Sequence, residues 1–369
     1  MWTFIMAAFV ILALGTEYYS HVLRTTLNPE VLLNASQIIL YWKYPLEEHE
    51  VETADSYILT LHRIPYGRTG QRPVIFLQHG LLSSTVSWIS NLPNSSLAFI
   101  LADAGFDVWM GNSRGNTYSR KHATLSTNSK EYWAFSFDEM VRYDRPASID
   151  YIVKKTGQKI YYVGHSQGTL LGFLAFSTLP QLAQKVKASY ALAPGISLKY
   201  GRSLPFRLLF MIRQSVLKLL LGDKDFLPET VITKFLVTDI CNNKIISIIC
   251  DKIIFELYGF EPKNLNMVRC VSFSSSQMLV TCSFYVRDNP YDILFSCSLS
   301  VFTQVPTALW SGQKDLVTNP EDVAILVPQI PNLIYHKILP TYNHLDFLFS
   351  LNAPQKIYNE IIEMIKKTP

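Results

Sequence analysis

The sequence predicts an α/β fold built on a mostly parallel sheet that is covered by helices on both faces. Strand-like runs rich in β-branched and aromatic residues alternate with helix-compatible stretches from about residue 44 to 194, and the alternation returns after residue 305. In addition, the pentapeptide Gly164-His165-Ser166-Gln167-Gly168 joins a strand-like run directly to an apolar helical run. Strands separated by helices favour parallel pairing, because a parallel crossover needs a connection about as long as a helix.

The expected strands share short apolar runs bounded by turn-forming residues. They cover residues 57–61, 73–78, 106–110, 160–163, 189–193, 307–310 and 334–338. Helices are expected over residues 138–154 and, with an amphipathic pattern, over residues 353–366.

Residues 195–304 interrupt this alternation. They contain apolar helical stretches at 206–212 and 216–221 instead of strand signals. Because the segments before and after complete one fold, we expect an inserted helical cap over an active site, and additional core is the alternative. The sheet domain then consists of two parts, residues 21–194 and 305–369.

Composition limits the class of protein. The chain has 369 residues, of which 49% are hydrophobic and 17% charged, so it predicts a globular protein. The net charge of +4 is small and the basic residues are scattered, so no nucleic-acid partner is expected. We expect a monomer without a transmembrane anchor.

The N-terminus indicates entry into the secretory pathway. An apolar run over residues 2–14 is too short to span a bilayer comfortably and resembles the core of a signal peptide, predicted here as residues 1–20. The alternative is a buried N-terminal segment. Two glycosylation sequons, at Asn34 and Asn94, agree with this route, which leads to a secreted or lysosomal protein.

The five cysteines all lie between Cys241 and Cys297, so at least one is unpaired or pairs with another chain. Cys241 and Cys250 bracket a short segment, and a disulfide between them is one open pairing. No cysteine or histidine spacing is typical of a zinc site. We therefore expect no metal, and the serine mechanism predicted below needs no cofactor.

Ser166 is the candidate nucleophile. In a strand–turn–helix context, a G-x-S-x-G pentapeptide predicts a nucleophile elbow, the sharp turn that exposes the serine of an α/β-hydrolase. The glycines on either side of the turn are needed because a Cβ there is expected to clash.

A serine hydroxyl needs an adjacent base, which a third group orients. In this fold the chain order is serine, acid, histidine, with the acid after a late strand and the histidine before the last helix. Asp315 and His344 fit these places, and the rival acids are Asp322, expected at the start of a surface helix, and Asp346. His165 lies within the elbow, and we expect a structural role for it.

An ester hydrolase also needs donors for the negative oxygen that forms during the reaction. One is expected to be the backbone N–H of Gln167, directly after the nucleophile. The other is the N–H of Leu81, on the loop after an early strand, where Gly80 permits the turn.

Several stretches together resemble the acid lipase family, the family of gastric lipase and lysosomal acid lipase. They are His79-Gly80-Leu81-Leu82, residues 88–94, 107–117, 135–140, 164–169 and 343–347. The resemblance covers roughly residues 28–268 and 305–365. It implies hydrolysis of neutral lipid esters at a lipid–water interface, with a cap that forms an apolar tunnel and a lid.

Position by position, the resemblance supports Ser166, Asp315 and His344 as the catalytic residues and the Leu81 and Gln167 amides as oxyanion donors. It also implies a disulfide between Cys241 and Cys250 and glycans on Asn34 and Asn94.

Residues 270–304 depart from the family. They lack its Ser-His-Asn-Pro-Ala-Gly-Thr-Ser and Tyr-Asp-Trp-Gly segments and run through Cys270, Cys282 and Cys297.

Taken as a whole, the sequence predicts a serine lipase acting on acylglycerols or sterol esters. Two alternatives stay open: a silent or poorly folding lipid-binding variant, and a short-chain esterase on the same fold.

Overall fold

The computed structural model describes residue 30 and residues 33–65, 72–195, 200–203, 259–260 and 304–367. The expected signal peptide (1–20), nearly all of the expected cap (195–304), and all five cysteines lie outside these residues. The boundaries predicted for them stay predictions.

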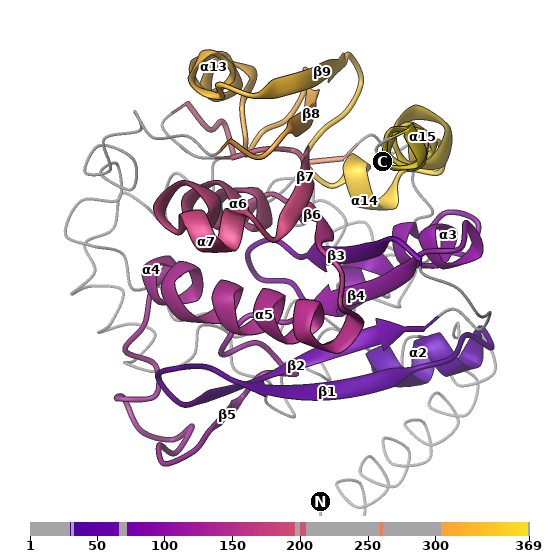
Figure 1. Ribbon diagram of the computed structural model, residues 1–369. Helices are drawn as coiled ribbons and strands as arrows, with labels where there is room; N and C mark the ends of the chain where they lie inside the picture. Colours follow the sequence, from indigo (N-terminus) through magenta and orange to yellow (C-terminus); the bar gives the residue numbers. More distant parts are fainter. Residues whose placement is uncertain are drawn as a thin grey trace, which may run out of the picture.

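A mixed sheet forms the centre of the described structure (Figure 1). Its strand order is β1-β2-β4-β3-β6-β7-β8-β9, and a short β5 pairs with β2. From β4 to β9 all neighbours are parallel, whereas β2 runs antiparallel to β1 and β4. The strands are β1 (Glu47–Glu52), β2 (Tyr57–Ile64), β3 (Val74–Gln78), β4 (Asp107–Gly111), β5 (Lys121–His122), β6 (Ile160–His165), β7 (Val186–Leu192), β8 (Thr307–Gly312) and β9 (Leu333–Leu339).

Each expected strand is present, and the predicted fold class is confirmed. Strand β1 was not expected, because its sequence Glu-Glu-His-Glu-Val-Glu carries almost no apolar signal. It lies at the sheet edge and buries only Val51 fully, so its charged side chains can remain in water.

The helices lie on both faces of the sheet (Figure 1). They are α2 (Ala35–Tyr41), α3 (Leu97–Asp103), α4 (Phe137–Glu139), α5 (Arg145–Thr156), α6 (Gln167–Thr178), α7 (Pro180–Ala183), α13 (Pro320–Leu326), α14 (Asp346–Phe349) and α15 (Asn359–Lys367). Short 3-10 turns cover Thr85–Trp88 and Val327–Gln329, and π-helical turns cover Met140–Asp144 and Pro354–Tyr358. The helices expected over 138–154 and 353–366 are therefore present, each with a π-helical turn in or before it.

The buried side chains form three apolar clusters, and β3 contributes to two of them. In β3, Ile75 and Leu77 pack toward α3 and α15, whereas Val74 and Phe76 pack toward α5 and α6. Successive residues of a strand point to opposite faces. A buried strand in a two-faced sheet therefore reads as a continuous apolar run, which is why these strands were visible in the sequence.

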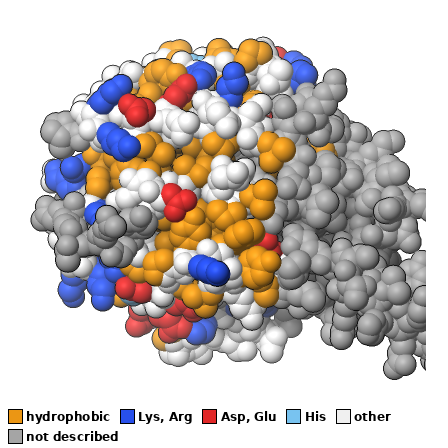
Figure 2. All heavy atoms as spheres, turned by 90° about the vertical axis from the view of Figure 1, so that its right-hand side faces the viewer, with side chains coloured by type: hydrophobic (Ala, Val, Ile, Leu, Met, Phe, Trp, Pro, Cys, Tyr) orange, Lys and Arg blue, Asp and Glu red, His pale blue; other side chains and the backbone are white. Residues whose placement is uncertain are grey.

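The face that α2, α3 and α15 border carries many hydrophobic side chains at its surface (Figure 2). Leu40 and Tyr41 at the end of α2 are among the exposed hydrophobic residues. Apolar atoms make up more than half of an ordinary protein surface, so this face alone assigns no partner. Within the described part of the chain, no helix combines the length and apolar character needed to cross a bilayer.

Candidate active site

Ser166 lies on a strained turn between β6 and α6. Its backbone angles are φ 53° and ψ −121°, outside the regions that non-glycine residues favour. A Cβ on Gly164 would lie 2.7 Å from the Gly168 backbone, and one on Gly168 would lie 2.2 Å from the Gln78 carbonyl oxygen. The clash predicted for the two glycines is present, and it also involves the neighbouring strand β3.

Three side chains that are far apart in the sequence form one hydrogen-bonded chain. His344 Nε2 lies 2.8 Å from Ser166 Oγ, and His344 Nδ1 lies 2.9 Å and 3.1 Å from the two carboxylate oxygens of Asp315. A carboxylate can only accept, so Nδ1 carries the proton and Nε2 is left to accept from the serine hydroxyl. Asp315 and His344 are both buried, which shields this chain from water.

The Asp315 carboxylate is fixed by its own loop. The backbone N–H groups of Val317 and Thr318 both donate to Oδ1 at 2.8 Å, and the Thr318 hydroxyl donates to Oδ2 at 2.8 Å. Such bonds hold the carboxylate plane in one orientation toward the imidazole. Thr318 could not be predicted as a partner of Asp315, because a threonine three residues after an aspartate is no specific signal.

The loop that carries His344 is held by Asn343 and Asp346. The Asn343 side-chain oxygen accepts from the His344 and Leu316 N–H groups, both at 2.9 Å, and so joins the two loops. Asp346, one of the rival acids, accepts from the Asn343 N–H at 2.7 Å. The carboxylate that contacts the His344 ring is that of Asp315.

The other rival acid, Asp322, lies in the first turn of α13, as expected. The helix is exposed at Glu321 and Ile325, as expected for a surface helix, but Asp322 itself is buried, at 2% exposure. Its carboxylate accepts from the Tyr200 N–H at 3.2 Å. The inner face of α13 is apolar and packs on β8 and α6, whereas Glu321, in the same turn as Asp322, is exposed.

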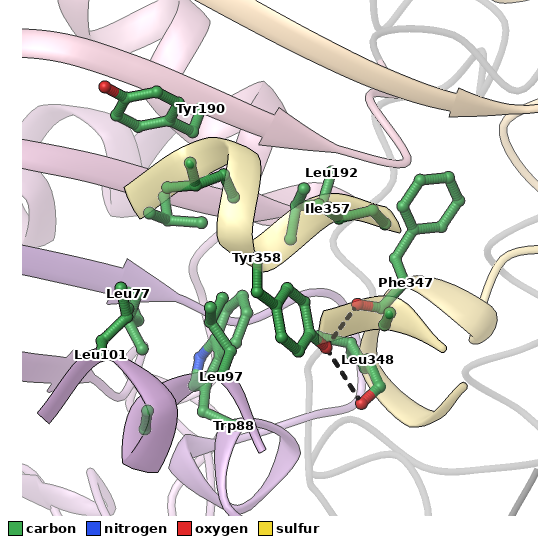
Figure 3. Close-up of a cluster of buried hydrophobic side chains, with 14 of the residues drawn as sticks. Leu77, Trp88, Leu97, Leu101, Tyr190, Leu192, Phe347, Leu348, Ile357 and Tyr358 are labelled. Atoms are coloured by element: carbon green, nitrogen blue, oxygen red, sulfur yellow. Dashed lines mark hydrogen bonds between the residues drawn. The ribbon is translucent and has the colours of Figure 1, made fainter. Parts of the chain in front are cut away.

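Tyr358 anchors the short helix that follows His344 (Figure 3). Its buried hydroxyl donates to the Phe347 and Leu348 carbonyl oxygens, at 2.8 Å and 3.3 Å. The Asn91 side chain also donates to the Leu348 carbonyl, at 3.3 Å. The packing of the C-terminal helix thus reaches the histidine loop, a contact that no local motif signals.

His165 has a structural contact to the same loop. It is buried, and its Nε2 donates to the His344 carbonyl oxygen at 3.1 Å. Burial, with a smaller contribution from the nearby His344 ring, lowers the pKa of His165 well below its usual value. A neutral imidazole in this place adds no charge beside the catalytic chain.

Two backbone amides are available beside Ser166. Within the described residues, no acceptor contacts the N–H of Leu81 or that of Gln167, which is the first residue of α6. A Cβ on Gly80 would lie 3.0 Å from the Ser166 Cβ, so the loop after β3 lies directly against Ser166. This close approach favours glycine at position 80, in addition to the turn predicted from the sequence.

Both expected glycosylation positions are exposed, and neither expectation is tested by the structure. The Asn34 side-chain oxygen accepts from the Gln37 N–H and caps α2. The side-chain nitrogen, to which a glycan is attached, is not used by this cap. The expected disulfide between Cys241 and Cys250 lies outside the described residues.

Comparison with protein families defines the class of the protein. Residues 73–351 match the family described as "alpha/beta hydrolase fold", and residues 35–92 match the "partial alpha/beta-hydrolase lipase region". Among solved structures, monoglyceride lipase from Saccharomyces cerevisiae is 14% identical, covers 88% of this chain and 97% of its own, and has a TM-score of 0.53. Epoxide hydrolase VrEH1 from Vigna radiata is 19% identical, covers 87% and 98%, and has a TM-score of 0.52. These structures show the fold alone.

Curated relatives define the family. Human gastric triacylglycerol lipase is 48% identical over 396 residues, covering 100% of this chain and 99% of its own. Human lipase member K is 46% identical with the same coverage, and human lysosomal acid lipase/cholesteryl ester hydrolase is 46% identical, covering 93% of each chain. The chain belongs to the acid lipase family of α/β-hydrolases, and it is a carboxylic ester hydrolase.

Proposed function

We propose that the protein hydrolyses neutral lipid esters, acylglycerols or sterol esters, with Ser166 as nucleophile, His344 as base and Asp315 as the orienting acid. The observation that carries the proposal is the hydrogen-bonded chain from Ser166 Oγ through His344 to Asp315. The Leu81 and Gln167 amides are the proposed oxyanion donors, since each lacks an acceptor within the described residues.

In the first half of the reaction, Ser166 Oγ attacks the ester carbonyl carbon while His344 Nε2 takes the hydroxyl proton. The carbonyl oxygen becomes negative and is stabilised by the two amides. The bond to the alcohol oxygen then breaks, and His344 returns the proton to the leaving alcohol. The acyl group remains on Ser166 as an ester.

In the second half, water attacks this acyl-enzyme and His344 Nε2 takes a proton from the water. The new oxyanion occupies the same donors, and its collapse releases the fatty acid as the serine recovers its proton. Asp315 keeps its negative charge throughout, because its part is to fix the Nδ1–H tautomer and to stabilise the imidazolium.

The substrate class rests on the relatives and on the predicted cap. Gastric triacylglycerol lipase and lysosomal acid lipase/cholesteryl ester hydrolase are named for neutral lipid esters. Within the family, we propose a similarity to lipase member J, which rests on the Phe226-Leu227-Pro228 stretch. The proposed cap, residues 195–304, supplies the acyl site, and residues 270–304 would make its lid and one wall unlike those of the family.

The proposed route is secretory, ending outside the cell or in the lysosome, with residues 1–20 removed and the monomer acting at a lipid–water interface. Exposure of Asn34 and Asn94 supports it. Asn34→Asp keeps a helix cap, since aspartate caps as well as asparagine, but removes the glycan acceptor. We expect this variant to lose the mass of one enzymatically removable glycan without loss of fold. An unchanged mass would exclude glycosylation there.

Activity-based labelling tests the proposed function. Full-length protein secreted from cells is treated with a fluorophosphonate probe, which reacts with activated serines. We expect labelling of the wild type and none of Ser166→Ala. The matched control is Ser177→Ala on the same helix, whose hydroxyl only donates to the Phe173 carbonyl, and it should label like the wild type. Folded wild-type protein without label would exclude the serine mechanism.

Ester assays separate the remaining alternatives. Emulsified triolein and cholesteryl oleate are compared with p-nitrophenyl butyrate on the same preparation. Turnover of the long-chain esters supports the lipase, whereas turnover of butyrate alone identifies a short-chain esterase. Labelling without turnover of any ester would favour a variant that binds lipid but is silent because its lid differs.

A further inference from the structure

The Gly80 carbonyl oxygen is held by a buried side chain from the preceding residue. His79 Nδ1 lies 2.7 Å from this oxygen, and the imidazole is 3% exposed. The carbonyl of Gly80 and the N–H of Leu81 belong to the same planar trans peptide, so they point in opposite directions. A group that fixes the carbonyl therefore fixes the N–H as well.

The tautomer of His79 follows from its other nitrogen. The Ser113 N–H donates to His79 Nε2 at 3.1 Å, and the Asn116 side-chain nitrogen lies 3.3 Å from it. With donors on this side, Nε2 accepts and the proton resides on Nδ1, from which it is donated to Gly80. Burial lowers the pKa of His79 to about 4, so the neutral form is kept.

The partners of His79 are themselves fixed. Ser113 and Asn116 belong to the loop after β4, where the Asn116 N–H donates to the Ser113 carbonyl at 3.2 Å and the Asn116 side chain donates to Asn112 at 3.0 Å. The Gln78 side chain reaches this loop by donating to Ser113 Oγ at 3.0 Å. Thus the imidazole connects two loops at the ends of neighbouring parallel strands.

The Gly80–Leu81 peptide needs such a restraint. A Cβ at position 80 would lie close to Ser166, which favours glycine there. Glycine, however, lets the chain adopt many backbone angles, so it does not restrain this peptide by itself. Two residues further on, Leu82 has φ 52°, a conformation that is unfavourable for a leucine. The local backbone alone therefore does not favour one direction of this peptide.

We propose that His79 is a positioning residue of the oxyanion site: its Nδ1–H holds the Gly80 carbonyl and thereby directs the Leu81 N–H toward the reacting oxygen. The inference deepens the proposed function and rests on it. His79 does not touch the substrate and acts only through the peptide that it holds.

Two substitutions separate this role from general packing. The amide nitrogen of His79→Asn can occupy the place of Nδ1 and keep the bond to Gly80, while the bond from Ser113 is lost. The longer His79→Gln places its amide near Nε2, so it keeps a bond to Ser113 and loses the one to Gly80. Both variants are neutral amides inside the same loop.

The experiment measures kcat and KM for a soluble ester, together with the thermal midpoint of unfolding and a crystal structure of each variant. We expect His79→Gln to lose about 100-fold in kcat with KM within about twofold, as for a misdirected oxyanion donor. His79→Asn should keep kcat within about fivefold of the wild type, as only its Gly80 bond matters for the donor. The Gly80 carbonyl should change direction in the His79→Gln crystal structure alone.

Equal losses of kcat in the two variants would overturn the inference, as would an unchanged Gly80 carbonyl in His79→Gln. If His79→Gln does not fold, His79→Ala replaces it, since alanine also lacks the bond to Gly80. If His79→Asn does not fold, the wild type is the reference with an intact Gly80 bond, and His79→Gln and His79→Ala should both lose kcat with a redirected Gly80 carbonyl. If the wild type turns over no ester, the proposed function fails, while the direction of the carbonyl still decides whether His79 holds the peptide.

Discussion

His344 Nε2 lies 2.8 Å from Ser166 Oγ, although the two residues are 178 positions apart in the chain. The serine is placed by the end of β6, and the histidine by the loop after β9, three strands away in the sheet. Parallel strands bring their carboxyl ends to one edge, which is where an α/β sheet holds its site. The meeting of these two residues is therefore a property of the whole sheet.

Asp315→Asn tests the orienting acid. Asparagine fills the same space but can present a donor to His344 Nδ1, which favours the wrong imidazole tautomer. We expect kcat to fall by about 10⁴-fold while KM changes little. The control is Glu321→Gln, an exposed carboxylate on the same side of β8, which should keep full kcat. A loss below tenfold in Asp315→Asn would contradict the proposed role.

Gly168→Ala tests the close approach of α6 to β3. The new Cβ would lie 2.2 Å from the Gln78 carbonyl oxygen, so backbone must move, and we expect the free energy of unfolding to fall by about 3 kcal/mol. Gly157→Ala is the comparison. A φ of 68° is unfavourable for alanine, but no atom lies within 4 Å of the added Cβ. This variant should lose about 1 kcal/mol in urea denaturation. Equal losses would show that the contact at Gly168 costs no more than the left-handed conformation at Gly157.

Arg114→Met tests the buried ion cluster that holds the loop after β4. The Arg114 guanidinium is fully buried and contacts Asp144 at 2.7 Å and Asp55 at 2.6 Å. Removing it leaves two carboxylates without their cation, and we expect a loss of about 3–5 kcal/mol in unfolding free energy.

The exposed pair of Lys185 and Asp150 is the control for this cluster. Solvent screens such a pair, so Lys185→Met should change the free energy of unfolding by less than about 1 kcal/mol. If urea denaturation gives similar losses for both variants, burial is not what makes the Arg114 cluster important.

The buried His62 predicts a pH dependence of stability. Burial lowers the pKa of His62 to about 4, against a weak opposing effect of the Glu48 charge. Between about pH 6.5 and 4 the unfolded chain binds a proton there and the folded chain does not. The stability contribution is therefore fully present above pH 6.5 and is lost as the pH falls toward 4.

His62→Gln removes this titration and keeps a polar group beside Thr85, the hydrogen-bond partner of His62 at 2.9 Å. Urea unfolding at pH 7 and at pH 4.5 should show a smaller drop for the variant than for the wild type. The quantity compared is the drop in the free energy of unfolding from pH 7 to pH 4.5. A substitution that lowers stability equally at both pH values does not change this drop. Identical drops in both proteins would mean that His62 already binds its proton when folded.

The sequence by itself determined those features that local physics controls. A buried strand between two layers of helices must be apolar along its whole length, so most strands were predictable, and the Gly-x-Ser-x-Gly turn can form only with small residues where backbones touch. The chain order of Ser166, Asp315 and His344 followed from the order of strands in this fold. Strand β1 escaped prediction because an exposed edge imposes no apolar pattern.

Only the tertiary structure decided which groups hold the candidate site in place. Thr318 holds the Asp315 carboxylate, Tyr358 holds the helix after His344, and His79 holds the Gly80 carbonyl. Asn343 joins the loops of Asp315 and His344, and the Ser113 N–H joins the loop after β4 to His79, so these groups depend on how different strands pack side by side. Their residue types are ordinary, and no spacing distinguishes them from other threonines, tyrosines or histidines. A hydrogen bond forms only within a narrow range of donor–acceptor distances. The packing of the folded sheet decides which segments, far apart in the chain, come within that range.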